Sequence, residues 1–217
     1  MRTSRLLLAV SAAASLVFLL ASPLVSGDWP VVFKVLSILL LAVLGFRVDI
    51  LLGVALSICA LGDFLLGVRR LGSPDGEQLF LLGLGSFLIA HLVYIAIFRK
   101  YRARDYWKLS PVRALGVLAI LATLGSVLGV LRHSLAPLLI PVVVYAVVLA
   151  GMGISAMLAD LGSPLAVFGA LSFIASDAVL AISKFRGPFP GHGPLIWITY
   201  YTAQLLISLG VARQRPS

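Results

Sequence analysis

Residues 50–68, ILLGVALSICALGDFLLGV, decide the fold of this chain, because they form an apolar run long enough to cross a membrane as a helix. Asp63 is the ionisable residue inside that run. A charged carboxylate near the bilayer core costs at least a few kcal/mol, so an aspartate there normally faces a cavity or a partner. The run therefore predicts a transmembrane helix that carries a functional acid near its end.

A second stretch, residues 175–180, repeats this layout with Asp177. In both stretches a small residue precedes the aspartate and a leucine follows three positions later. Cationic side chains follow where each apolar run ends: Arg69 and Arg70 after the first, Lys184 and Arg186 after the second. The chain thus contains two matched acids in apolar surroundings.

The composition places the whole chain in a membrane. Its 217 residues are 61% hydrophobic and 12% charged, and the mean hydropathy is +1.11. The net charge of +9 does not indicate nucleic acid binding, because the basic residues lie in the breaks between apolar runs and act as topology signals. A single cysteine, Cys59, excludes an intramolecular disulfide, and we expect it to be a packing residue.

A helical span needs about 20 mostly apolar residues. On that measure the chain is an all-α polytopic membrane protein, with residues 1–217 as a single transmembrane domain. The eight predicted spans are 6–26, 31–47, 50–68, 79–98, 112–131, 135–158, 164–183 and 195–212. Prolines at or just before several predicted first turns support these starts: Pro30, Pro111, Pro164 and Pro194.

The first span resembles a secretory signal peptide, because Arg2 and Arg5 precede an apolar run that ends in Ala21-Ser22-Pro23. Its apolar stretch is longer than a usual signal core, and no clean small-x-small site precedes a polar segment. We therefore interpret it as a retained helix.

Lysine and arginine are distributed unequally between the two sides of the predicted bundle. The side of the termini carries eleven: Arg2, Arg5, Arg47, Arg99, Lys100, Arg102, Arg104, Lys108, Arg113, Arg213 and Arg215. The opposite side carries five: Arg69, Arg70, Arg132, Lys184 and Arg186. This asymmetry places both termini in the cytoplasm. If the protein is bacterial, the membrane is the cell (inner) membrane.

In that orientation the third and seventh spans both run outward. Five residues separate Asp63 from Arg69 and six separate Asp177 from Lys184, or about 8–10 Å of helix. The two acids are therefore expected at nearly the same depth. A parallel four-plus-four repeat would explain this, and its match extends to His91 and Gln204, which follow the two acids by 28 and 27 positions.

Several other polar residues lie within predicted spans. Lys34 could neutralise an aspartate, hold a substrate phosphate, or extend to the interface along its aliphatic stem. The remaining candidates could orient water or a head group, or could make ordinary packing contacts: His91, Tyr94, Tyr145, Tyr200, Tyr201 and Gln204.

Two neighbouring carboxyls in a low-dielectric pocket favour a state in which one is protonated and the other ionised, which is an acid/base pair. Helix-helix hydrogen bonding is the structural alternative. The histidines are not spaced as zinc ligands, and no serine has glycine at both −2 and +2, so neither a metal site nor a nucleophile elbow is predicted. We expect acid/base chemistry without metal or cofactor.

Five partial motifs resemble the YhhN-like lysoplasmalogenase family, and they cover the chain from the second span onward. They are Gly62-Asp63-Phe64-Leu65-Leu66, Phe87-x-x-x-His91-x-x-Tyr94, Tyr145 through Met152, Ser176-Asp177-x-x-Leu180-Ala181 and Tyr201-x-x-Gln204-x-Leu206-Ile207. The family usually has proline after the second-span lysine, whereas Val35 follows Lys34 here.

This resemblance implies hydrolysis of the vinyl ether bond of lysoplasmalogens, with Asp63 and Asp177 at the two acidic catalytic positions. The products would be a fatty aldehyde and glycerophosphoethanolamine or glycerophosphocholine. The implied partners are a lysophospholipid substrate and the lipid bilayer.

Two other classes remain as alternatives. A proton-coupled transporter or lipid-binding membrane protein could use one aspartate as a proton carrier. An intramembrane aspartyl protease also needs two membrane aspartates, but its Gly-x-Gly-Asp motif has Ala60 in place of the first glycine here.

Overall fold

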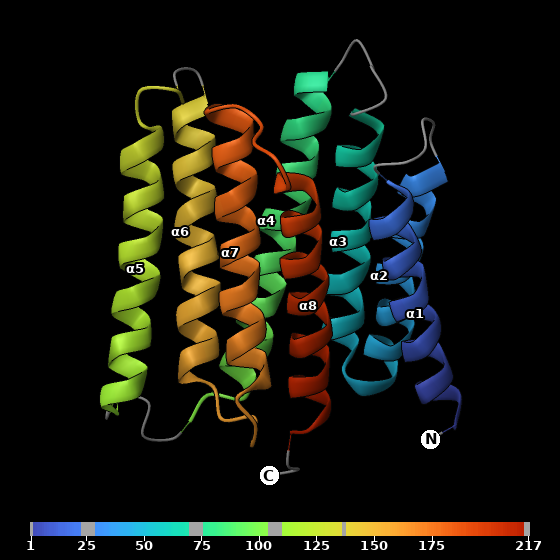
Figure 1. Cartoon of the computed structure of the whole chain (residues 1–217). Coiled ribbons are helices and arrows are strands. Elements are labelled where there is room, and N and C mark those ends of the chain that lie inside the picture. The colour runs from blue at the N-terminus through green and yellow to red at the C-terminus, as the bar shows by residue number, and fades with distance from the viewer. Residues whose placement is uncertain (1, 23–28, 70–75, 104–109, 136–137, 215–217) are drawn as a thin grey trace. The chain divides into compact units, whose positions relative to one another are not determined.

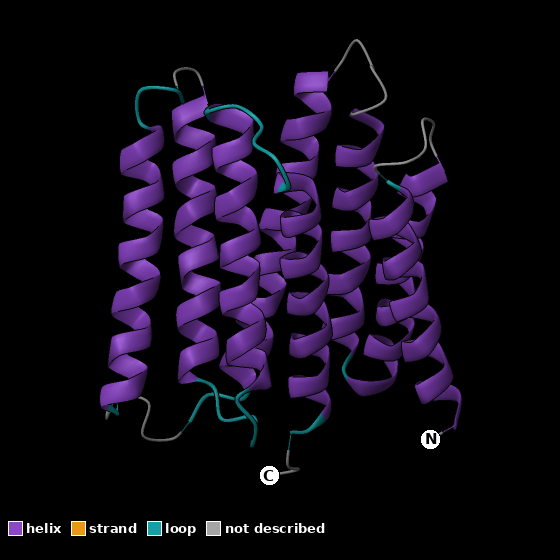
Figure 2. Cartoon of the chain, in the orientation of Figure 1, coloured by secondary structure: helices purple, strands orange, loops and turns teal. Residues whose placement is uncertain are grey.

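A computed structural model of the chain describes residues 2–22, 29–69, 76–103, 110–135 and 138–214. These ranges contain eight helices and no strand (Figures 1 and 2). The helices are α1 (Arg2–Ala21), α2 (Trp29–Val48), α3 (Ile50–Arg69), α4 (Gly76–Lys100), α5 (Pro111–Leu131), α6 (Leu139–Leu158), α7 (Leu165–Phe185) and α8 (His192–Ala212). Each is long and apolar enough to span a membrane. A lone helix can span lipid because it satisfies its own backbone hydrogen bonds.

The predicted all-α architecture with eight spans is confirmed for the described residues. The first helix begins earlier than its predicted span of 6–26, since arginine is a good helix former and residues 2–5 join the helix. The predicted end of that span falls within 23–28, outside the described residues. The sixth helix begins at Leu139 instead of residue 135, and the Leu138 N–H just before it donates to the Leu135 carbonyl at 2.8 Å.

The chain divides into two compact units, residues 1–94 and 95–217, and the division falls inside α4. In the first unit α1, α2 and α3 lie side by side (Figure 1). The buried Ser11 hydroxyl of α1 donates to the Ser37 carbonyl of α2 at 2.7 Å. Asp49 lies between α2 and α3, and its Oδ1 accepts from the Leu51 N–H at 2.8 Å, which satisfies a free donor at the start of α3.

In the second unit α7 lies against α8, and small residues let the two backbones approach closely (Figure 1). A Cβ placed on Gly169 would lie 2.8 Å from the Ile207 nitrogen and 2.9 Å from the Ala203 oxygen. Ser172 and Ser176, one turn apart on α7, donate to the Thr199 and Ile196 carbonyls of α8 at 2.7 and 3.0 Å. These bonds fix the rotation of α7.

The helices α5, α6 and α7 also pack against one another in the second unit. Gly153 of α6 faces the Ile174 and Ile120 side chains, so three helices meet at this glycine. At one end a buried cluster of Leu131, Leu135 and Val142 closes the α5–α6 connection. Helix α7 therefore packs against both α6 and α8.

Replacing Gly169 with alanine should destabilise the second unit, because the added Cβ would meet backbone atoms that cannot move aside. We expect the free energy of unfolding to fall by about 1–3 kcal/mol, measured by thermal or denaturant unfolding in detergent micelles. Gly125→Ala on α5 is the matched control, since a Cβ there meets nothing within 4 Å. That control should be neutral or stabilising by up to about 1 kcal/mol. Equal stability of the two variants would contradict the close α7–α8 approach.

Candidate active site

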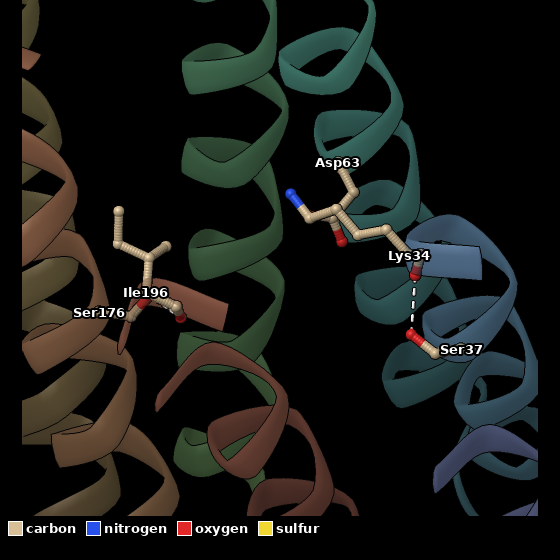
Figure 3. A network of polar contacts seen from close by, with 5 residues as sticks. All are labelled: Lys34, Ser37, Asp63, Ser176 and Ile196. Carbon is tan, nitrogen blue, oxygen red and sulfur yellow. Dashed lines mark hydrogen bonds and ion pairs between the residues drawn. The ribbon is translucent and has the colours of Figure 1, made fainter. Parts of the chain in front are cut away.

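Asp63 lies in α3 with a side chain that is only 1% exposed. Its Oδ1 forms an ion pair with Lys34 Nζ of α2 at 2.8 Å, and the lysine is 17% exposed. Figure 3 shows the two side chains, which come from neighbouring helices. Of the roles considered for Lys34, the structure shows the one in which it neutralises an aspartate.

Local packing positions this ion pair. Ser37, three residues after Lys34, donates from Oγ to the Lys34 carbonyl at 2.7 Å (Figure 3). The Ser37 carbonyl in turn accepts from Ser11 of α1, so a chain of two hydrogen bonds connects α1 to the turn that carries Lys34. A Cβ on Gly67, one turn after Asp63, would lie 2.5 Å from Val31 Cγ1. The missing side chain at Gly67 lets α2 and α3 approach near the pair.

Gly62, the residue before Asp63, packs against α4. A Cβ at this position would lie 2.8 Å from the Phe87 ring of α4, so only glycine fits without moving that ring. The Gly62-Asp63 pair in the sequence therefore combines close packing on α4 with an ion pair to α2.

A buried ion pair of this kind needs both partners. Desolvation of each ion costs several kcal/mol, and the attraction between the charges at low dielectric offsets that cost only while the pair is intact. The Asp63–Lys34 pair is thus a strict local constraint on the packing of α2 and α3.

Asp177 lies in α7 of the second unit and is half-buried. Its Oδ2 accepts a hydrogen bond of 2.6 Å from the Tyr145 hydroxyl of α6. Ser176, its neighbour, donates to the Ile196 carbonyl of α8 (Figure 3). Adjacent residues of α7 therefore contact helices on two sides, which fixes the direction of the Asp177 side chain. In the part of the chain that the structure describes, Asp177 has no ion-pair partner.

The two acids thus differ in their surroundings. Asp63 has a cationic partner and Asp177 has a neutral phenol. They lie in different compact units, Asp63 in residues 1–94 and Asp177 in residues 95–217. The structure brings together Lys34 with Asp63 and Tyr145 with Asp177. The sequence offered Lys34 as a possible counterion of an aspartate without saying which one, and it offered Tyr145 as a separate candidate.

The remaining candidates of the first unit are deeply buried. His91 and Tyr94 of α4 each have 0% exposure. The Tyr94 side chain is hydrogen-bonded to the thiol of Cys59, which is also fully buried in α3. Cys59 is therefore a polar partner as well as a packing residue, and no motif in the sequence predicted this pairing.

The remaining candidates of the second unit belong to α8. Gln204 has 0% exposure, and its carbonyl accepts from the Ser208 hydroxyl at 2.7 Å. Tyr201 is half-buried, with its ring centroid 5.9 Å from that of Trp197. Trp197 also lies 5.6 Å from the ring of buried Tyr200. Three aromatic rings of α8, those of Trp197, Tyr200 and Tyr201, thus lie in contact within the second unit.

The last candidates are metal ligands and the cations near the helix ends. Among the described residues no three His, Cys, Asp or Glu side chains gather as metal ligands, and the expected metal-independent reaction stays a prediction. The side chain of Arg69 and all of Arg70 lie outside the described residues. Lys184 lies in the last turn of α7 and is half-buried.

Eight described helices that are each long and apolar enough to cross a bilayer define an integral, multi-pass membrane protein. The model of the YhhN family matches residues 29–211, and the chain belongs to that family.

Similar proteins in bacteria and mammals have been named for one activity. A Mycobacterium bovis protein named lysoplasmalogenase is 32% identical over 157 residues, which are 72% of this chain and 58% of that protein. Human lysoplasmalogenase TMEM86B is 37% identical over 135 residues, 62% of this chain and 54% of that protein. The chain thus spans little more than half the length of these relatives. Rat lysoplasmalogenase TMEM86B is 31% identical over 210 residues, 93% of this chain and 81% of that protein. No solved structure matches the chain.

Replacing Lys34 with methionine should destabilise the first unit by roughly 3–5 kcal/mol, because Asp63 would remain buried without its cation. Unfolding of the purified protein in detergent measures this loss. The double variant Lys34→Met/Asp63→Asn removes both charges and should recover most of the stability. If the double variant is as unstable as the sum of the two single variants, the ion pair does not couple α2 to α3.

Proposed function

We propose that this protein is a lysoplasmalogenase, which hydrolyses the vinyl ether bond of a lysoplasmalogen. The reaction would release a fatty aldehyde and glycerophosphoethanolamine or glycerophosphocholine. Membership of the YhhN family and the names of the similar proteins support this proposal. The observation that carries it is a carboxylate, Asp63, buried to 1% exposure and held by an ammonium inside an apolar helix unit.

The chemistry of a vinyl ether suits paired carboxyl groups. Protonation of the double-bond carbon that is not attached to oxygen leaves an oxocarbenium ion at the other carbon. Water adds to that carbon, and the resulting hemiacetal collapses to an aldehyde and an alcohol. One carboxyl supplies the proton, while the other stabilises the cation and accepts a proton from water, as in two-carboxylate glycosidases. Asp63 and Asp177 are the proposed pair, and no metal or cofactor takes part.

The substrate has one hydrocarbon chain and a zwitterionic head group, so it is delivered by the bilayer. We assign the hydrocarbon chain to the apolar helix surfaces and the phosphate to cations near the ends of the helices. Lys184 is the proposed phosphate contact in the second unit, since it follows Asp177 by seven residues, or about 10 Å of helix. Lys34 contacts Asp63, and its role in this proposal is to hold that carboxylate. The other polar candidates, His91, Tyr94, Tyr201 and Gln204, are proposed to orient water or the head group.

Both termini are proposed to lie in the cytoplasm, with Asp63 and Asp177 toward the outer side, because lysine and arginine are concentrated on the side of the termini. In a bacterium the membrane would be the cell membrane. The vinyl ether would then be cleaved in the outer half of the bilayer.

Single cysteines should report this orientation in intact cells. In a Cys59→Ala parent, a cysteine at exposed His133 should react with a membrane-impermeant thiol reagent, whereas one at Gln214 should react only after permeabilisation. His133 lies in the α5–α6 turn and Gln214 follows α8. The opposite labelling pattern would invert the proposed topology.

Asp63→Asn and Asp177→Asn should each lower aldehyde release from an alkenyl lysophospholipid at least about 100-fold, since each removes one partner of the acid/base pair. The measurement is aldehyde production by the purified, folded variants in detergent. Asp160→Asn is the matched control and should keep wild-type turnover. Asp160 is exposed in the α6–α7 connection, and its Oδ1 only accepts a hydrogen bond from Gly162 N–H at 3.4 Å, which asparagine preserves. Near-normal turnover in either of the two site variants would overturn the proposal.

A further inference from the structure

We propose that the two acids have fixed and different roles: Asp177 donates the proton to the vinyl ether, and Asp63 acts as the carboxylate. This inference rests on the proposed function. Its basis is the difference between the two partners, an ammonium on Asp63 and a phenol on Asp177.

Asp63 is suited to the ionised role. Its Oδ1 lies 2.8 Å from Lys34 Nζ, and its exposure of 1% keeps water from weakening that attraction. An opposite charge at this distance favours the charged form of a carboxyl group. A proton on Asp63 would leave the partly buried Lys34 ammonium without its counterion, so Asp63 is a poor resting proton donor.

Asp177 is suited to the protonated role. The Tyr145 hydroxyl donates to Oδ2 at 2.6 Å, so Oδ2 acts as the acceptor and Oδ1 is the oxygen that carries the proton. The part of the chain that the structure describes offers Asp177 no cation within ion-pair distance. A neutral carboxylic acid avoids the cost of a buried charge without a counterion. The phenol is neutral as well, so this arrangement places no charge on the Asp177–Tyr145 pair at rest.

With these roles the reaction balances. Asp177 transfers its Oδ1 proton to the alkenyl carbon and becomes a carboxylate, which Tyr145 continues to stabilise by its hydrogen bond. Water attacks the oxocarbenium carbon as Asp63 takes one of its protons. When the hemiacetal collapses, its hydroxyl proton returns to Asp177, and Asp63 gives its proton to the departing glycerol oxygen. Both acids regain their starting states, and one water is consumed.

Tyr145 is a positioning residue in this scheme, because it acts through Asp177. It fixes the carboxyl so that Oδ1 faces away from the phenol. It also stabilises the carboxylate that forms after proton transfer. Removing its hydroxyl should therefore alter Asp177 itself, beyond any effect on helix packing.

Infrared spectroscopy of the purified, substrate-free protein at neutral pH tests the assignment directly. Wild type should show the C=O stretch of a protonated carboxyl group, and 13C-labelled aspartate should shift it. The band should be absent from Asp177→Asn and present in Asp63→Asn. Tyr145→Phe should move the band to higher frequency, because the carbonyl loses its hydrogen bond. Asp49→Asn, which changes the acid that caps α3, is the control and should leave the band unchanged.

If Asp177→Asn does not fold, Asp177→Glu retains a carboxyl, and its band should stay while losing sensitivity to 13C-aspartate. A band lost in Asp63→Asn, or no protonated carboxyl in wild type, would overturn the assignment. The readout needs no substrate, so it is distinct from a failure of the proposed function. Aldehyde release by a wild-type protein that lacks this band would support the proposed hydrolase activity and would reject only the assignment of Asp177 as the acid and Asp63 as the carboxylate.

Discussion

The ion pair between Lys34 and Asp63 is the interaction on which the first unit depends. A charge inside an apolar helix is tolerated only with a partner, and here the partner comes from the neighbouring helix at 2.8 Å. Much of the surrounding packing serves this contact. Gly67 lets α2 approach α3, Gly62 makes room for Phe87 of α4, and Ser37 bonds the turn that carries Lys34. The result is an acid whose position is determined by three helices.

The second unit also holds one carboxyl group in a defined position, but it does so with hydrogen bonds and without an ion pair among the described residues. Its acid has a phenol in place of an ammonium, and its helix is fixed by serine hydroxyls that bond to backbone carbonyls of α8. Hydrogen bonds between neutral groups are well suited to apolar surroundings, since they satisfy polar atoms without adding charge. Each unit thus presents one carboxyl in a defined environment. Asp63 has an ammonium beside it and Asp177 a phenol, and the proposed acid/base chemistry depends on that difference.

The sequence predicted the helices well, because length and hydropathy alone decide which segments can span lipid. It also identified both aspartates, since a carboxylate in an apolar run is conspicuous. The partners were less predictable: Lys34 and Tyr145 lie 29 and 32 positions from their acids, and only packing brings them together. The Tyr94–Cys59 contact and the bonds of Ser172 and Ser176 were not predicted, because single small polar residues resemble packing residues in a sequence. The four-plus-four repeat and the single-domain organisation stay predictions.

The proposed activity of this YhhN-family protein is cleavage of a vinyl ether, and not of an ester, in a single-chain phospholipid. The most direct test is to incubate the purified protein with an alkenyl lysophospholipid and with its acyl counterpart of equal chain length and head group, and to measure aldehyde and fatty acid together. The account predicts aldehyde from the alkenyl lipid and no fatty acid from the acyl lipid. Fatty acid from the acyl lipid, or no aldehyde from the alkenyl lipid, would contradict it.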